Sequence, residues 1–401
     1  MLNRLARAAA AALLAVGAPF VATSHAYTFS QLYVFGDSLS DPGNAAALTE
    51  VVPGVPGLTR ISAFPPSSPS GIPDLGLPYN YRFSNGPVAA EYLSGFLGIA
   101  PSVPAWPAAP GNANSNFAVG GAMSGAGPIN GANPIVPNVP PALQGLCCNF
   151  NSLVNNPPQL AAFPDVLDTG MNNQVALFAS RLGSGDIAPF DPASTLFSLW
   201  GGPNDVFLAL ALAAGLPPAD QMAVLQAYTI NAALNIGTRI GELATLNAEN
   251  FLVINMPNLG QTPFAAQAGL TAELTLLSIA FNTVLDSTLD SLRAGLGLTI
   301  IEFDSFGALG DLIAGGPFSN VTEPCFDEGD VAGSLPRIIG GCQGYLFFDG
   351  VHPTTATHQI LAAQLYREIP EPGGVALILT GLLALTVLRR LTGGGAARAR
   401  R

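Results

Sequence analysis

Residues 27–44 read YTFSQLYVFGDSLSDPGN, in which a strand-like run leads into a turn that contains Ser38. Tyr27–Phe35 has the apolar and aromatic composition of a strand, and the chain then enters Gly36-Asp37-Ser38. A serine at a strand-to-helix turn stands clear of the sheet edge, and the amides that follow can point at an anion. The alternative is a serine that caps a helix. Ser40 occupies the second glycine position of the Gly-x-Ser-x-Gly elbow, which argues against an ordinary α/β-hydrolase.

Outward from this stretch, apolar runs alternate with segments of helical spacing. The predicted strands are 115–119, 195–200, 251–255 and 298–303. The predicted helices are 87–98, 171–182, 219–246, 263–296 with a break at Gly269, and 353–367. Strands that are apolar throughout indicate a parallel sheet with both faces covered. The sequence therefore predicts an α/β fold with a central parallel sheet, and long loops at its carboxyl edge suit the rim of a site.

The small number of histidines limits the candidates for a general base. The chain has three histidines, and one of them, His25, lies in a segment that we expect to be removed. His352 follows Asp349 in the sequence DGVHP at 349–353. A carboxylate three residues before a histidine can fix the tautomer of the ring and stabilise the imidazolium. His358 lies on a predicted helix, where we expect an ordinary surface or packing role.

Two further strand ends carry groups that suit a developing negative charge. Residues 116–122 (NFAVGGA) end a strand in two glycines, so the backbone can approach a ligand closely. Residues 201–205 (GGPND) follow another strand and offer the side-chain amide of Asn204. Each segment alone also fits a plain turn. Their order along the chain, together with Ser38 and the Asp-x-x-His sequence, favours a hydrolytic site.

These blocks resemble those of the GDSL or SGNH hydrolase family, and they extend from Val34 to Pro353. The resemblance implies a three-layer α/β/α flavodoxin-like fold and ester hydrolysis without a metal or other cofactor. Residues 81–87 (YRFSNGP) and 345–348 (YLFF) resemble the larger secreted bacterial esterase/lipase branch of this family.

The same resemblance assigns roles to individual residues. It implies that Ser38 is the nucleophile, that His352 is the general base and that Asp349 orients His352. It also implies an oxyanion hole made by the Ser38 amide, the Gly121 amide (or that of Gly120, if the register is shifted by one) and the Asn204 side chain.

The function that follows is a serine esterase or lipase, which cleaves carboxylic esters of small molecules or lipids through an acyl-enzyme. An acyltransferase or a polysaccharide O-deacetylase are alternatives on the same scaffold, and a noncatalytic cell-surface protein is a distant one. The apolar stretches 51–61 and 134–146 have three possible roles: to line an acyl groove, to form a lid, or to pack. The sequence carries no signal for the length of the ester chain or for an oligomeric state.

The two ends of the chain read as targeting segments rather than as parts of the hydrolase domain, 27–369. Residues 1–26 have the arginines, the apolar core and the small residues of a secretory signal, with cleavage expected before Tyr27; an amphipathic core helix is the alternative. Residues 370–401 combine Pro-Glu-Pro, an apolar run at 375–388 and terminal arginines, and they resemble the PEP-CTERM sorting signal. This resemblance implies export, transient membrane anchoring and processing by an exosortase. A plain tail anchor is the alternative.

Charge excludes one class of partner. The 401-residue chain has a formal net charge of −12, contains no lysine, and carries seven arginines against 25 acidic residues between Tyr27 and Ile369. A nucleic-acid-binding surface needs a basic stripe, which this segment does not provide, so we expect no nucleic-acid partner.

The four cysteines suit an oxidising compartment rather than a metal site. Cys325 and Cys342 flank the acidic, glycine-rich loop 326–341 and are plausible disulfide partners, a closure worth roughly 3 kcal/mol. Cys147 and Cys148 are adjacent, and their pairing stays open. No cysteine or histidine spacing suggests zinc.

Overall fold

The computed structural model describes residues 29–45, 82–105, 116–125, 169–327 and 337–370. Within them a parallel sheet contains, in spatial order, β1 (Gln31–Gly36), β2 (Thr195–Trp200), β3 (Asn250–Ile254) and β4 (Thr299–Phe303). Residues 116–119 lie against the other side of β1, where the Phe117 N–H donates to the Val34 carbonyl. Counted as the second strand, this segment gives the order 2-1-3-4-5 of flavodoxin-like sheets.

Strands β1, β2 and β3 are buried on both faces, which explains why they are largely apolar, whereas β4 at the edge includes the exposed Glu302. Every residue of β2 and β3 is buried, and so is β1 from Leu32 onward. Aromatic side chains fill the space on one face, where Phe35 stacks on Phe117 with 5.3 Å between ring centroids and Phe178 meets Phe35 edge to face.

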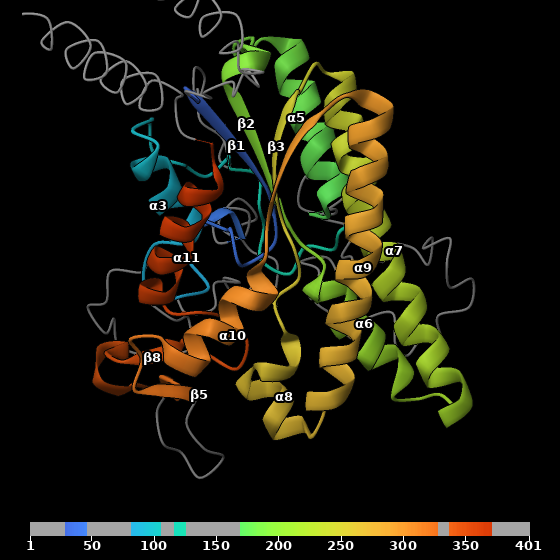
Figure 1. Cartoon of the computed structure of the whole chain (residues 1–401), viewed down its shortest axis with the longest axis vertical. Helices are drawn as coiled ribbons and strands as arrows, with labels where there is room; N and C mark the ends of the chain where they lie inside the picture. Colours follow the sequence, from blue (N-terminus) through green and yellow to red (C-terminus); the bar gives the residue numbers. More distant parts are fainter. Residues whose placement is uncertain (1–28, 46–81, 106–115, 126–168, 328–336, 371–401) are drawn as a thin grey trace, which may run out of the picture. The chain divides into compact units, whose positions relative to one another are not determined.

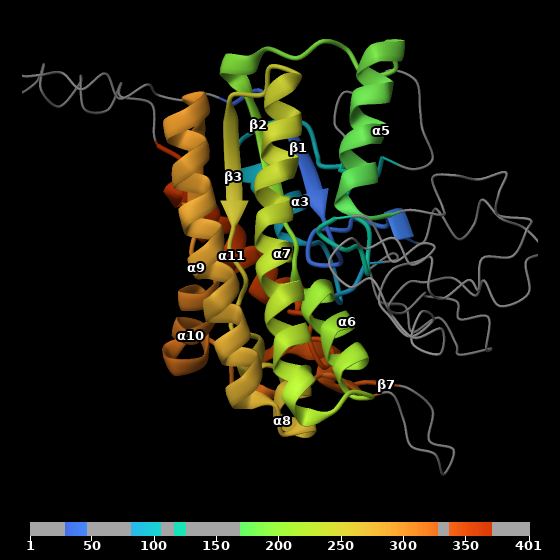
Figure 2. The same cartoon turned by 90° about the vertical axis from the view of Figure 1, so that its right-hand side faces the viewer.

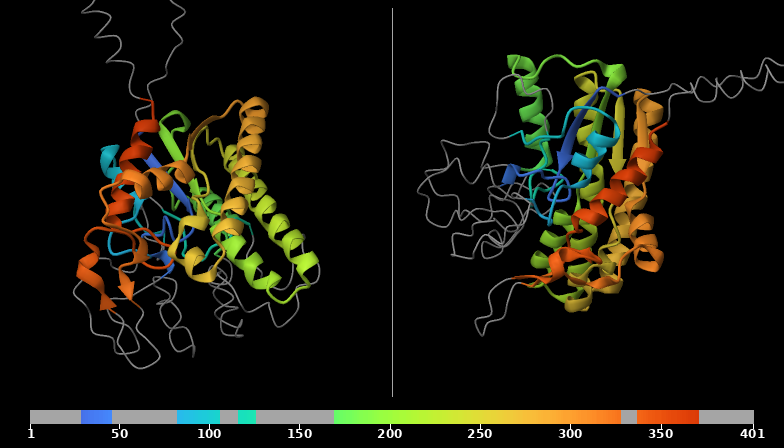
Figure 3. Two further views of the ribbon diagram at one scale, coloured as in Figure 1. Left: turned by 60° about the horizontal axis from the view of Figure 1, so that its bottom comes forward. Right: turned by 90° about the vertical axis from the view of Figure 1, so that its left-hand side faces the viewer.

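Helices cover the two faces of the sheet (Figure 1). One layer contains α5 (Met171–Ser184), α7 (Pro218–Thr245) and α9 (Thr271–Leu296), and the other contains α3 (Ala89–Phe96) and α11 (Thr355–Glu368). Figure 3 shows α3 and α11 side by side, and the Tyr92 and Thr355 hydroxyls join them with a 2.8 Å hydrogen bond. The predicted α/β/α fold with a central parallel sheet is confirmed.

Several elements lie outside the predicted set. The remaining elements of the described residues are η4 (Pro192–Ser194), α6 (Pro203–Ala213), η5 (Leu259–Gln261), α8 (Pro263–Ala268), α10 (Ser305–Gly315), β5 (Asn320–Pro324), β6 (Phe326–Asp327), β7 (Arg337–Ile338), η6 (Ile339–Cys342) and β8 (Tyr345–Phe347). β5 pairs with β8 in parallel, and β6 pairs with β7 in antiparallel fashion. The break predicted at Gly269 is confirmed, because Gly269 ends α8 in the left-handed region with φ 67°. Neither α6 nor α10 is predicted: α6 is apolar on most of its faces and lacks a helical period, and the glycines of α10 lower its helix propensity.

The strands all run toward the end of the domain at which α6 and α8 lie (Figure 2). The segments that follow β1, residues 116–119 and β2 therefore meet at one edge of the sheet, which is where open α/β sheets bind ligands. The predicted targeting segment 1–26 lies outside the described residues, and so does the segment 370–401 apart from Pro370. The apolar stretches 51–61 and 134–146 and the pair Cys147 and Cys148 also lie outside them.

Candidate active site

A pocket of about 260 Å³ lies at this carboxyl edge. Its lining includes Ser38 from the turn after β1, Gly121 from the turn after residues 116–119, Asn204 from the start of α6, and His352 from the turn after β8. Four segments that are far apart in the sequence thus contribute to one cavity.

Short polar contacts that begin in the pocket join three side chains in a row. Ser38 Oγ lies 2.7 Å from His352 Nε2, and His352 Nδ1 lies 2.7 Å from Asp349 Oδ2. In a neutral imidazole whose Nδ1 carries the proton, the Nδ1–H group donates a hydrogen bond to Asp349. The unprotonated Nε2 can then accept a hydrogen bond from the Ser38 hydroxyl. The arrangement can move a proton from Ser38 to His352.

The turn that carries this histidine is held at several points. Asp349 Oδ1 accepts hydrogen bonds from the backbone N–H groups of Val351 (2.9 Å) and His352 (2.7 Å). The Phe348 N–H donates to the His352 carbonyl at 2.7 Å, which closes the turn from the other side. The ring of Phe83 packs against the imidazole, with 5.3 Å between their centroids. The imidazole therefore has little freedom to leave Ser38.

The two ionisable partners perturb each other. Burial disfavours the charge on His352, but the facing carboxylate of Asp349 and the more distant Asp37 outweigh it and raise the pKa of His352. Burial likewise disfavours the charge on Asp349, but His352 and three hydrogen bonds outweigh it and lower the pKa of this carboxyl. Asp349 thus stays ionised while His352 exchanges a proton.

Asp37, next to the nucleophile, is a buried carboxylate to which the sequence reasoning gave no role. Its Oδ1 accepts the Leu39 N–H at 3.0 Å, and its Oδ2 has no hydrogen-bond partner. Burial raises the pKa of Asp37 to about 7. The signal in the sequence is an acidic residue directly after a fully apolar strand, where a side chain has little access to water.

Three N–H groups in the pocket can receive an anion. The backbone N–H groups of Ser38 and Gly121 donate to no group among the described residues. Asn204 uses one hydrogen of its amide for the Ala122 carbonyl at 2.9 Å and keeps a second. The Gly120 N–H, by contrast, donates to Asp41 Oδ2 at 2.8 Å. The amide that faces the pocket unoccupied is therefore that of Gly121 rather than Gly120.

The two glycines are required by geometry. A Cβ atom on Gly120 would lie 2.0 Å from the ring of Phe83, the residue that also packs on His352. Gly121 has φ +77°, in the left-handed region that favours glycine. Both positions therefore favour glycine, Gly120 because a side chain would collide with Phe83 and Gly121 because of its backbone conformation.

Much of the pocket lining is apolar. One side, which we call the apolar wall, is formed by Leu309 and Leu312 of α10, Phe347 of β8 and Leu361 of α11. Neither α10 nor β8 belongs to the predicted elements, so the position of this wall is not predictable from the sequence pattern. The pocket thus combines polar groups at one place with apolar side chains elsewhere, as is usual for sites that bind small molecules.

Three other residues that the sequence analysis names lie outside the pocket lining. His358 is fully buried rather than on the surface; its Nδ1 accepts the Ala89 N–H at 3.3 Å, and burial lowers its pKa to about 3. Cys325 and Cys342 form a disulfide, and both pack against Phe348 in a small core of their own. Among the described residues, no cluster of histidine, cysteine and acidic side chains has the make-up of a metal site. No helix in the described ranges combines the length and apolar character needed to cross a bilayer.

Comparison with known proteins places the chain in a family. Residues 32–365 match the model of the family described as GDSL-like Lipase/Acylhydrolase. "GDSL esterase/lipase At5g22810" of Arabidopsis thaliana is 31% identical over 148 residues, which cover 33% of this chain and 41% of that protein. "Anther-specific proline-rich protein APG" of the same plant is 26% identical over 369 residues, 85% of this chain and 61% of that protein.

The chain thus spans less than two thirds of the length of these two relatives. "Acetylajmalan esterase 2" of Rauvolfia serpentina is 26% identical over 373 residues, 85% of this chain and 90% of that protein. The family model covers most of the chain and contains every segment that lines the pocket. The chain belongs to the GDSL-like lipase/acylhydrolase family.

Proposed function

We propose that the protein is a serine esterase or lipase in which Ser38, His352 and Asp349 form a catalytic triad. The observation that carries the proposal is the 2.7 Å contact between Ser38 Oγ and His352 Nε2, inside a pocket that also holds unoccupied N–H donors. Nucleophile, base and orienting carboxylate lie in the order that acyl transfer requires.

In the proposed mechanism His352 Nε2 removes the hydroxyl proton as Ser38 Oγ attacks the ester carbonyl. The carbonyl oxygen becomes an oxyanion, which the N–H groups of Ser38 and Gly121 and the Asn204 amide stabilise. The intermediate then collapses: the bond to the alcohol oxygen breaks, and His352 gives the proton to that oxygen. The product of this step is an acyl group on Ser38 and a free alcohol.

Water completes the cycle. His352 takes a proton from a water molecule, which attacks the acyl carbonyl, and the second tetrahedral intermediate releases the carboxylic acid and returns the proton to Ser38. An acyltransferase would use an alcohol in place of this water. Product analysis in the presence of an acceptor alcohol separates the two reactions.

The apolar wall and the net charge of the chain limit the classes of ester that we expect as substrates. Apolar side chains of α10, β8 and α11 favour an ester that carries a hydrocarbon chain. The acidic excess between Tyr27 and Ile369 disfavours polyanionic substrates.

We further propose that the protein is exported by residues 1–26 and sorted by the PEP-CTERM-like segment 370–401, as in the bacterial branch that it resembles. Composition supports this: arginines precede the first apolar core and follow the second. Mass spectrometry of the cell-derived protein should find Tyr27 as its first residue and a C-terminus near Pro370–Pro372. An intact N-terminus would contradict export by this signal.

The test of the enzyme proposal is Ser38→Ala, assayed with p-nitrophenyl esters and with a fluorophosphonate probe. We expect folded Ser38→Ala to lose both turnover and labelling, because no other group replaces the nucleophile. Ser184→Ala is the matched control, since Ser184 is an exposed serine at the end of α5 whose hydroxyl contacts Asp186. Wild-type rates in Ser38→Ala would overturn the proposal.

A further inference from the structure

The turn that carries Gly121 is held at both ends by buried carboxylates. At its start the Gly120 N–H donates to Asp41 Oδ2 at 2.8 Å. At its end the Ser124 N–H donates to Asp205 Oδ2 and the Ser124 hydroxyl donates to Asp205 Oδ1, each at 2.9 Å. We call residues 120–124 the glycine turn. Asp41 is 0% exposed and Asp205 is 4% exposed, so neither carboxylate is a surface cap.

Asp41 joins the glycine turn to the turn of the nucleophile. Besides Gly120, it accepts the N–H groups of Gly43 (2.7 Å), Asn44 (2.5 Å) and Ala45 (3.1 Å). One carboxylate therefore receives four amides from two segments that are far apart in the sequence. The distance between those segments is fixed by two oxygen atoms of a single side chain.

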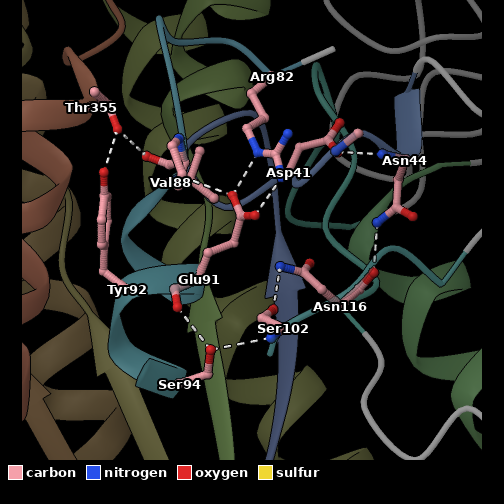
Figure 4. A network of polar contacts seen from close by, with 12 residues as sticks. Asp41, Asn44, Arg82, Val88, Glu91, Tyr92, Ser94, Ser102, Asn116 and Thr355 are labelled. Carbon is pink, nitrogen blue, oxygen red and sulfur yellow. Dashed lines mark hydrogen bonds and ion pairs between the residues drawn. The ribbon is translucent and has the colours of Figure 1, made fainter. Parts of the chain in front are cut away.

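Asn44 and Asn116 brace the same two segments a second time (Figure 4). The Asn44 side chain donates to the carbonyls of Asn116 (2.6 Å) and Ala118 (2.8 Å), just before the glycine turn. In return the Asn116 side chain donates to the Ser40 carbonyl at 2.7 Å, just after the nucleophile. The strand 116–119 and the Ser38 turn thus form one cross-linked unit.

Asp205 holds the other end of the glycine turn, at Ser124. It follows Asn204 in the first turn of α6, and Asn204 itself donates to Ala122 inside the glycine turn. Asn235 of α7 adds a contact of 3.1 Å to the Ser124 hydroxyl. The side chain that is proposed to bind the oxyanion and the carboxylate that holds the turn therefore leave the same helix end.

Keeping two carboxylates inside the protein is costly. Burial raises the pKa of Asp41 and of Asp205 to about 6 in each case, despite the amides that they accept. A neutral serine or asparagine can cap a turn at lower cost. Ionised acceptors, however, make shorter and stronger hydrogen bonds to amides than neutral ones, and they hold a loop in one geometry. A rigid turn matters most where an amide must meet charge that develops only in the transition state.

We propose that Asp41 and Asp205 are positioning residues: from the two ends of the glycine turn, they hold the Gly121 amide at the distance from Ser38 that the oxyanion requires. The proposal rests on the proposed function. Neither residue touches the reacting atoms, and the effect of each passes through the backbone of the glycine turn.

The test compares Asp41→Asn, Asp41→Ala and Asp205→Asn with the wild type. Asparagine keeps one acceptor oxygen and loses the other, so we expect kcat to fall roughly 10- to 100-fold while KM changes less than about twofold. Asp41→Ala should fall further than Asp41→Asn. Asp191→Asn is the matched control, because Asp191 accepts the Ala193 N–H (3.1 Å) and the Ser194 hydroxyl (2.9 Å) at an exposed turn and should leave kcat unchanged.

A second readout separates positioning from general loosening of the fold. An alkyl boronic acid forms a tetrahedral adduct with the Ser38 hydroxyl, so its inhibition constant should rise by about the same factor as kcat falls. Equal losses in kcat and substrate affinity, in proportion to a lowered melting temperature, would overturn the proposal, as would an unchanged kcat. Ser124→Ala removes one donor to Asp205 and keeps both carboxylates, so it tests the same idea if an Asp205 variant fails to fold; we expect a loss of roughly threefold to tenfold in kcat. If Ser38→Ala is inactive and the aspartate variants keep wild-type kcat, this inference fails while the proposed function stands.

Discussion

The groups around Ser38 fall into two sets, one ionisable and one neutral, which we call the ionisable side and the amide side. On one side lie His352, Asp349 and Asp37, three ionisable groups whose pKa values are all shifted by burial and by one another. On the other side lie the amides of Ser38 and Gly121 and the Asn204 side chain, which are neutral and do not titrate. The ionisable side should therefore determine how activity varies with pH as long as Asp41 and Asp205, whose pKa values burial raises to about 6, stay ionised and hold the glycine turn.

The comparison also concerns rigidity. The imidazole is oriented by one carboxylate and one aromatic ring, whereas the glycine turn is tied to its surroundings by hydrogen bonds at Gly120, Ala122 and Ser124. In the proposed mechanism His352 takes up and releases a proton, whereas the N–H donors of the oxyanion hole must keep a fixed position during the reaction. The denser set of bonds lies where preorganisation matters most.

The largest expected effect is on the ionisable side, from Asp349→Asn. The asparagine would keep a carbonyl toward the Val351 and His352 amides and present an NH₂ group to His352 Nδ1. This forces the imidazole proton onto Nε2, where it faces Ser38 and blocks proton transfer. We expect kcat to fall by about 10⁴ with p-nitrophenyl esters. A loss below tenfold would contradict the role of Asp349 in orienting His352 on the ionisable side.

The next effect belongs to the amide side. Asn204→Ala removes a donor without changing any charge, so kcat should fall by about 10²–10³ while KM stays close to the wild-type value. The acidic limb of the kcat/KM profile against pH should not move, because His352 keeps both of its partners. A shifted limb would show that the two sides are not separable.

A smaller effect is expected at the apolar wall, which belongs to neither side. Leu309→Trp should reduce turnover of p-nitrophenyl octanoate about tenfold relative to the acetate. The larger side chain would occupy part of the pocket that the octanoyl chain needs and the acetyl group does not. Leu276→Trp is a suitable control, since Leu276 is 64% exposed on α9. Equal effects on both esters would remove the wall from the substrate site.

The smallest effect at neutral pH should come from Asp37→Asn. His352 must be neutral to accept the proton, so activity is lost as pH falls below its pKa, which the negative charge of Asp37 helps to raise. Without that charge the pKa of His352 falls, and the acidic limb of the kcat/KM profile should move to lower pH. A limb that moves to higher pH, or stays in place, would show that Asp37 has no electrostatic contact with the base.

The sheet and the ends of its strands are predictable from the sequence because they depend on local composition. The range predicted for β2 equals the observed one, Thr195–Trp200, and that for β3 is displaced by one residue, since a strand buried on both faces is apolar at every position. Ser38, Gly121 and Asn204 follow such strands, and the fold then brings them to one edge.

The braces between segments are not predictable in the same way. Asp41 and Gly120 are 79 residues apart, and a bond between a carboxylate and a distant backbone amide leaves no period or composition bias in the sequence. The apolar wall escaped prediction for a different reason. It depends on α10, whose glycines hide its helical character, and on β8, which has only three residues.

The hydrogen bond between Ser38 and His352 joins residues that are 314 positions apart. During synthesis the nucleophile leaves the ribosome early, and its base is among the last residues of the folded domain to emerge. In the proposed mechanism the nascent polypeptide therefore carries an inert serine through nearly all of translation, and the proposed capacity to cleave esters arises only when the final β8–α11 segment docks. Interactions that close such large loops form slowly, so the appearance of activity marks the end of folding rather than its beginning.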